Sequence, residues 1–87
     1  TAEAPALPND MALYAVMYDE LQRIAHAHRA RWQGNDTLNT TALVHEAYLK
    51  LADMDGFANR AHALAVASRA MRQVLISYAV ARRAAKR

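Results

Sequence analysis

The sequence predicts an all-α fold, a small bundle of three main helices with a long basic C-terminal helix. Larger apolar residues recur at intervals of three and four through most of the chain, which is the period of amphipathic helices. Only two glycines and two prolines interrupt the 87 residues, and no stretch alternates apolar and polar residues as a β-strand does. Cysteine is absent, so disulfides and thiolate metal sites are excluded.

The first helix is expected to follow residues 1–8, an Ala- and Pro-rich stretch that we expect to be a disordered N-terminal segment, leaving a domain over residues 9–87. Asn9 or Asp10 can cap this helix, because a short side-chain oxygen accepts hydrogen bonds from the free N–H groups of the first turn. Gly34 is expected to end it. Its inner face comprises Tyr14, Met17, Tyr18, Leu21, Ile24, Ala25, His28 and Trp32.

A polar loop over residues 34–39 is expected to lead into a second helix, which Thr40 or Thr41 caps and which runs to about Asp53. The inner face of this helix comprises Leu43, Val44, Ala47, Tyr48 and Leu51. Leu49 is a large apolar residue on the opposite, outward face. An exposed leucine needs no special explanation, but beside polar neighbours it can also form part of a docking surface.

After a short turn over residues 53–58, Asn59 is expected to cap a third helix without an internal breaker through residue 87, about 40 Å long. Its inner stripe comprises Leu64, Ala67, Ser68, Met71, Val74, Leu75 and Tyr78. Arg69, Arg72, Gln73, Ile76, Val80, Arg83 and Arg87 lie mostly outside that stripe. Because two shorter helices cannot cover its whole length, the last turns are expected to project from the bundle.

Charge is distributed unevenly along the chain. Residues 1–55 carry four Lys/Arg and eight Asp/Glu, whereas residues 56–87 carry seven Lys/Arg and no acid. A last third that is positive throughout favours a polyanionic partner, either nucleic acid or an anionic membrane surface. A basic tail that only keeps the chain soluble is the alternative.

The sequence holds little catalytic chemistry. His45 and Glu46 begin a zinc-protease motif, but position 49 is Leu where the second His is required. A glycine-rich phosphate loop and a nucleophile elbow are also missing, so we expect no enzyme, cofactor or metal site. Without a signal-peptide pattern or an apolar run of ~20 residues, we expect a cytoplasmic protein with no membrane partner.

The sequence alone suggests roles for two further side chains. Phe57, in the turn before the basic helix, can plug the end of the bundle or stack against a nucleic-acid base. His28, on the inner stripe of the first helix, is expected to be a hydrogen-bonded histidine at the edge of the core.

Several segments together resemble region 2 of bacterial sigma factors, most closely those of the extracytoplasmic-function (ECF) group. The segments are Leu13-Tyr14, Tyr18-Asp-Glu-Leu-Gln-Arg-Ile-Ala25, Thr41-Ala-Leu-Val-His-Glu-Ala-Tyr-Leu-Lys-Leu51, Asn59-Arg-Ala-His62, Ala65-Val-Ala-Ser-Arg-Ala-Met-Arg72 and Ala81-Arg-Arg-Ala-Ala-Lys-Arg87. The resemblance covers roughly residues 11–87, and the second-helix motif is its most specific part. Since the chain begins at Thr1 and is too short for the family's −35-recognising domain, we expect an isolated −10-recognising domain.

The resemblance implies two partners. In the family the second helix docks on the coiled-coil clamp helices of the RNA polymerase β′ subunit, and here the matching outward residues are Ala42, His45, Glu46, Leu49 and Lys50. In the family the third helix and the turn before it bind the promoter −10 element and hold its opened strand. The corresponding candidates are Phe57, Asn59, Arg60, Arg69, Arg72, Gln73, Arg82 and Arg83.

Two departures from the family pattern stand out. Bulky or aromatic residues are usual near the start of the third helix, where this chain has Ala63 and Leu64, so either strand opening uses fewer stacking groups or the core is thinner there. An acidic cluster often precedes the second helix, where this chain has no acid. We hypothesise that phosphorylation of Thr40 or Thr41 by a Ser/Thr kinase restores that charge. Alternatively, the threonines only cap the helix.

Two other function classes stay open from the residues alone. A self-contained helix-turn-helix DNA-binding module would need compact helices, a short turn and a short recognition helix. A protein-interaction bundle, such as an adaptor controlled by a partner, would not bind nucleic acid at all. Control of the sigma-factor domain by an anti-sigma factor is a further expectation.

Overall fold

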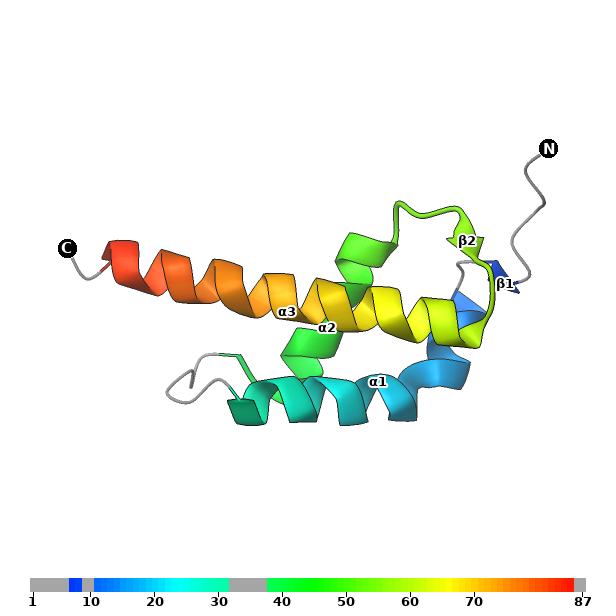
Figure 1. Cartoon of the computed structure of the whole chain (residues 1–87), viewed down its shortest axis with the longest axis horizontal. Coiled ribbons are helices and arrows are strands. Elements are labelled where there is room, and N and C mark those ends of the chain that lie inside the picture. Colours follow the sequence, from blue (N-terminus) through cyan, green and yellow to red (C-terminus); the bar gives the residue numbers. More distant parts are fainter. Residues whose placement is uncertain (1–6, 9–10, 32–37, 86–87) are drawn as a thin grey trace.

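The computed structural model describes residues 7–8, 11–31 and 38–85 of the chain. The element order is β1 (Leu7–Pro8), α1 (Met11–Arg31), α2 (Thr40–Leu51), β2 (Gly56–Phe57) and α3 (Arg60–Ala85). α1 and α3 lie side by side, and the shorter α2 crosses them (Figure 1). The predicted all-α bundle with a long C-terminal helix is therefore confirmed.

α1 and α3 run parallel with a constant register. Glu20 forms an ion pair with Arg60, and His28 Nε2 lies 2.8 Å from Ser68 Oγ. In both pairs the partners are 40 residues apart in the chain. Because this offset is the same at two points, the end of α1 lies beside the middle of α3, a turn or so after Ser68.

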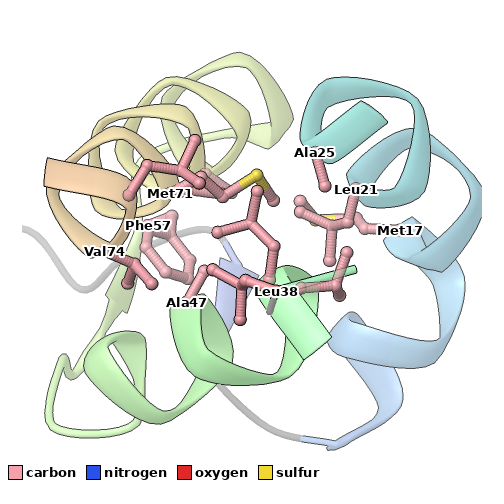
Figure 2. Close-up of a cluster of buried hydrophobic side chains, with 13 residues drawn as sticks. Met17, Leu21, Ala25, Leu38, Ala47, Phe57, Met71 and Val74 are labelled. Carbon is pink, nitrogen blue, oxygen red and sulfur yellow. The ribbon is translucent and has the colours of Figure 1, made fainter. Parts of the chain in front are cut away.

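One hydrophobic core joins the three helices, and Figure 2 shows the buried side chains converging from all of them. The core contains Met17, Leu21, Ala25, Leu38, Leu43, Val44, Ala47, Phe57, Ala63, Ala67, Met71, Val74 and Leu75. The inner faces predicted from the helical period supply most of it. The half-buried residues that pack around its edge include Tyr14, Tyr18, Ile24, Leu51, Leu64 and Tyr78. Tyr48 is also half-buried, and its ring centroid lies 4.4 Å from that of Tyr14.

Leu38 corrects the prediction of a polar loop over residues 34–39, because its side chain is only 2% exposed. It precedes the N-cap residue of α2, and Leu43, also fully buried, stands at the fourth helical position. These are the two positions of a hydrophobic staple, which sets the angle at which the chain enters a helix.

The cap of α2 is Asn39, not Thr40 or Thr41 as the sequence predicted. Its side-chain Oδ1 accepts a hydrogen bond of 2.8 Å from the Ala42 N–H. The predicted cap of α3 is confirmed, since Asn59 Oδ1 accepts from the His62 N–H at 2.9 Å. The predicted signals at Asn9, Asp10 and Gly34, together with Trp32 and residues 86–87, lie outside the described residues.

A small antiparallel β-bridge replaces part of what the sequence assigned to a disordered segment and a turn. Leu7 pairs with Phe57, and Pro8 pairs with Gly56. Gly56 has a φ of 151°, a backbone conformation that residues with a Cβ avoid. The glycine therefore allows the chain to turn into β2 and to direct Phe57 into the core.

The C-terminal part of α3 projects beyond the bundle, as predicted (Figure 1). Leu75 is the last fully buried residue of the helix. From Ser77 to Ala85 every described residue is exposed or half-buried. Tyr78 is the last residue that packs against the core, so about 10 Å of helix, up to Ala85, lies beyond it.

Candidate functional site

The outer face of α2 is a compact surface on the side opposite the core. It comprises the predicted residues His45, Glu46, Leu49 and Lys50, together with Ala42, which is half-buried and also packs against the core. Their spacing places them on one side of the helix, with Leu49 near the centre. Leu49 is 52% exposed, while His45 and Lys50 are exposed and Glu46 is half-buried. The α2 outer face is thus an apolar centre with a charged rim, the composition of a small protein interface.

The first turn of α2 carries no acidic residue, and its two threonines are not engaged in capping. Thr40 is half-buried and lines a cleft of about 430 Å³ together with Gln22, Arg23 and His26 of α1. Thr41 is exposed, and its Oγ1 accepts a 3.5 Å hydrogen bond from Gln22 Nε2. The alternative in which these threonines serve only as caps is therefore wrong.

Phe57 is only 2% exposed, which corrects its assignment to the DNA-contacting residues. Its ring packs edge-on against the His62 ring, with centroids 5.8 Å apart. The His62 ring is held in turn, because its Nδ1 accepts a 3.0 Å hydrogen bond from the Ala58 N–H. Of the two roles considered, Phe57 plugs the end of the bundle, since a buried ring has no free face for a base.

Asn59 and Arg60 are exposed, but each has a partner within the chain. The Asn59 side chain caps α3. The Arg60 guanidinium is ion-paired with Glu20, so part of its charge is already balanced. Both side chains therefore have a structural role, Asn59 at the start of α3 and Arg60 between α3 and α1. Any contact with DNA would be additional to that role.

The start of α3 is thinly packed where the family pattern has bulky residues. Ala63 is 1% exposed and borders a small apolar cavity of about 20 Å³, which is also lined by Leu13, Tyr14, Met17, Leu21, Tyr48, Leu51 and Phe57. This cavity agrees with the thinner core considered for Ala63 and Leu64, and the other consequence, strand opening with fewer stacking groups, stays a prediction. Neither side chain is an exposed stacking platform, since Leu64 is half-buried.

Arg69 and Arg72 meet residues of α1 that sequence reasoning did not assign to any site. They line a cleft of about 440 Å³ with Ser68, His28 and Arg31, which we call the α1–α3 cleft. The predicted hydrogen bonding of His28 is confirmed by its contact with Ser68. Burial lowers the pKa of His28, and the positive charges of Arg31 and Arg72 lower it further, which favours the neutral imidazole.

The remaining predicted DNA residues lie farther along α3. Gln73 is exposed, and its Nε2 lies 3.5 Å from Ser77 Oγ one turn later. Arg82 is half-buried and Arg83 is exposed on the projecting end. Helical spacing places Arg69, Arg72, Gln73 and Arg83 on one side of α3. The same spacing places Arg60 and Arg82 on the other side of α3, where Arg60 pairs with Glu20 of α1. The middle arginines therefore share a side with Arg83, whereas Arg60 and Arg82 lie apart from them.

The family model for ECF sigma factors matches residues 8–87, which is nearly the whole chain. The chain belongs to the ECF sigma factor family. Comparisons with curated proteins and with solved structures found no match. The match includes the described helices and covers both the α2 outer face and the α1–α3 cleft.

As an ECF sigma factor, the protein functions in transcription initiation, and its family implies RNA polymerase and promoter DNA as partners. The family consists of non-catalytic regulators. Within the described residues, the side chains of His, Asp and Glu form no group of three that could hold a metal ion. None of the described helices is long and apolar enough to cross a membrane.

Proposed function

We propose that this ECF sigma factor chain docks the α2 outer face on the β′ clamp helices of RNA polymerase and presents α3 to the promoter −10 element. The observation that carries the proposal is the exposed Leu49 at the centre of the α2 outer face. The fold has buried the other side of α2, where Leu43, Val44 and Ala47 are almost fully covered. A half-exposed leucine with a polar rim is therefore available for a partner.

Charge along α3 supports the DNA part of the proposal. Arg69 and Arg72 are exposed, and Arg83 follows on the same side of the projecting end. Among the described residues, those that line the α1–α3 cleft with Arg69 and Arg72 include no carboxylate. Cations on one side of a helix attract the phosphate backbone and make binding salt-dependent. We withdraw Phe57 from the DNA-contacting set and retain Asn59, Arg60, Arg69, Arg72, Gln73, Arg82 and Arg83 as proposed contacts.

Titration of the full chain against a fragment that contains the β′ clamp helices tests the polymerase part. We expect saturable binding that is retained at about 200 mM salt, because an apolar centre contributes a part of the affinity that salt does not screen. A parallel titration with labelled oligonucleotides should show binding that weakens steeply with salt. Failure of the chain to bind the clamp fragment would contradict the docking proposal.

Phosphorylation of Thr40 or Thr41 is proposed as the control of this docking. Asn39, and neither threonine, is the cap of α2, so a phosphate on Thr40 or Thr41 would not remove the capping hydrogen bond. A phosphate there would lie at the positive end of the helix dipole, where the chain has no acid. Thr40 also faces Arg23 and His26 across a cleft, which gives a phosphate on this residue a cationic neighbour within the chain. Thr41 is the more exposed residue and the better placed to meet arginines of the clamp.

The Thr41→Glu variant is therefore expected to bind the clamp fragment about 2–5-fold more tightly than the wild type, the effect of a charge pair at the edge of an interface. Thr41→Gln has nearly the same size without the charge and is the matched control. Because glutamate carries less charge than phosphate, the chain phosphorylated at Thr41 should show a larger gain. Equal affinities for all four forms would contradict control by phosphorylation at Thr41 and would leave the docking proposal intact.

A further inference from the structure

We propose that the α1–α3 cleft binds a phosphodiester group of DNA, with Arg31 of α1 as a DNA contact beside Arg69 and Arg72 of α3. This inference rests on the proposed function and adds to it a residue from outside α3. The cleft belongs to two helices whose contributing residues are about 40 positions apart, so no continuous motif shows it. It also lies away from the α2 outer face, because neither α2 nor its outer residues line it.

The geometry of the cleft follows from the parallel register of α1 and α3. His28 and Ser68, which are in contact across the two helices, both line it. Arg31, one turn after His28, is the last residue of α1. Arg69 and Arg72 follow Ser68 on α3. Three guanidinium groups from two helices therefore surround one cleft of about 440 Å³, which exceeds the size of a single phosphate group.

The charge of the cleft is not balanced within the described part of the chain. None of the five lining residues is acidic, and the ion pair identified among the described residues joins Arg60 to Glu20 instead. Arg31 and Arg72 both lie near enough to His28 to lower its pKa. Like charges held close together repel one another, and a bound anion relieves that repulsion. Arginine in particular suits a phosphate, because its planar fork donates two parallel hydrogen bonds.

The helix dipole of α1 explains the position of only one of the three arginines in the α1–α3 cleft. Cations near a helix C-terminus are stabilised by the partial negative charge there, and this accounts for Arg31. Arg69 and Arg72 stand in the middle of α3, more than two turns from either end, where the dipole offers no such stabilisation. The convergence of the three arginines therefore requires a reason beyond helix stability.

A DNA backbone, with its repeated phosphates, fits the residues around the α1–α3 cleft better than a single free phosphate does. Arg83 lies on the same side of α3 as Arg69, about 21 Å farther along the helix. Over that length one strand of a duplex carries about six phosphates. The cleft is thus the first cationic site on a side of α3 that continues to the projecting end. DNA following that side would place one phosphodiester in the cleft and others near Arg83.

The test compares Arg31→Gln with Arg23→Gln in the full chain. Both variants lose one positive charge from α1, and both positions are exposed, but Arg23 lines a different cleft. Binding to a labelled 20-nucleotide DNA of mixed sequence is followed by fluorescence anisotropy between 50 and 200 mM salt. We expect Arg31→Gln to bind about 3–10-fold more weakly at low salt. The slope of log K against log salt should become shallower by about 0.7–0.9, the value of one phosphate contact. Arg23→Gln should keep the wild-type slope.

The His28 ring gives a second readout by NMR. A phosphodiester in the cleft opposes the positive charges of Arg31, Arg69 and Arg72, so DNA should raise the pKa of His28 above its value in the free chain. Inorganic phosphate alone should leave the His28 signals unchanged at concentrations where DNA saturates them. Equal response to inorganic phosphate would overturn the phosphodiester assignment in favour of a free anion.

The outcomes separate this inference from the proposed function. If the wild type binds DNA and the two arginine variants have the same affinity and slope, the α1–α3 cleft is not a DNA contact, while DNA binding by α3 stands. If the wild type does not bind DNA even at 50 mM salt, this inference and the DNA part of the proposed function are overturned together, while docking on the clamp is decided by its own titration. Far-UV circular dichroism of the variants confirms that each is folded before the comparison.

Discussion

Phe57→Ala is expected to lower the free energy of unfolding by about 3–5 kcal/mol, the usual cost of removing a buried aromatic ring from a core. Phe57 is 2% exposed and borders an apolar cavity that already exists beside Ala63. Removing the ring enlarges that cavity and exposes the end of the bundle. A domain of 87 residues has a stability of only about 4–13 kcal/mol, so this loss is a large fraction of the total. Urea unfolding monitored by circular dichroism measures it.

Phe57→Leu keeps most of the apolar volume and is the variant to use if Phe57→Ala does not fold. Its expected loss is below about 1.5 kcal/mol, as for other swaps of similar volume. Both variants should bind the labelled DNA with wild-type affinity wherever they are folded, because the ring is inside the bundle. A stable Phe57→Ala chain with strongly reduced DNA binding would instead restore Phe57 as a base-stacking residue.

Leu49→Ala is expected to weaken binding to the β′ clamp fragment by at least about 10-fold, the effect of truncating a central interface residue. The fold should tolerate the change, since Leu49 is half-exposed and alanine is the strongest helix former. Loss of affinity would therefore report on the α2 outer face and not on unfolding. Isothermal titration or anisotropy with the clamp fragment measures the effect.

Val16→Ala is the matched control for Leu49→Ala. Val16 is an aliphatic residue on α1 with 67% exposure, so its truncation also removes exposed apolar surface, but from another helix. We expect the Val16→Ala chain to bind the clamp fragment like the wild type. Equal losses for the two variants would mean that the clamp contacts the bundle without preference for the α2 outer face. No loss for either would place the docking surface elsewhere.

Much of the fold follows from the sequence because helical periodicity and caps are local properties. The intervals of three and four predicted the buried faces of α1, α2 and α3, and they also predicted that Leu49 is exposed. Asn59 was predicted as the cap of α3 because a single suitable residue stands before that helix. At the start of α2 three consecutive residues can cap, and the prediction placed the cap at Thr40 or Thr41 although asparagine is the stronger cap. In the structure the helix begins after Asn39, because Leu38 before this residue and Leu43 after it are both buried in the core.

The sequence by itself thus determined the three-helix architecture, the inner and outer faces of each helix and the resemblance to ECF sigma factors. Only the tertiary structure decided that Phe57 is buried, that Arg60 is paired with Glu20, and that Arg31 joins Arg69 and Arg72. The reason is that each of these outcomes depends on contacts between separate elements. A helix period specifies which side of α1 meets a neighbour, but the parallel register with α3, an offset of 40 residues, arises only when the two helices pack.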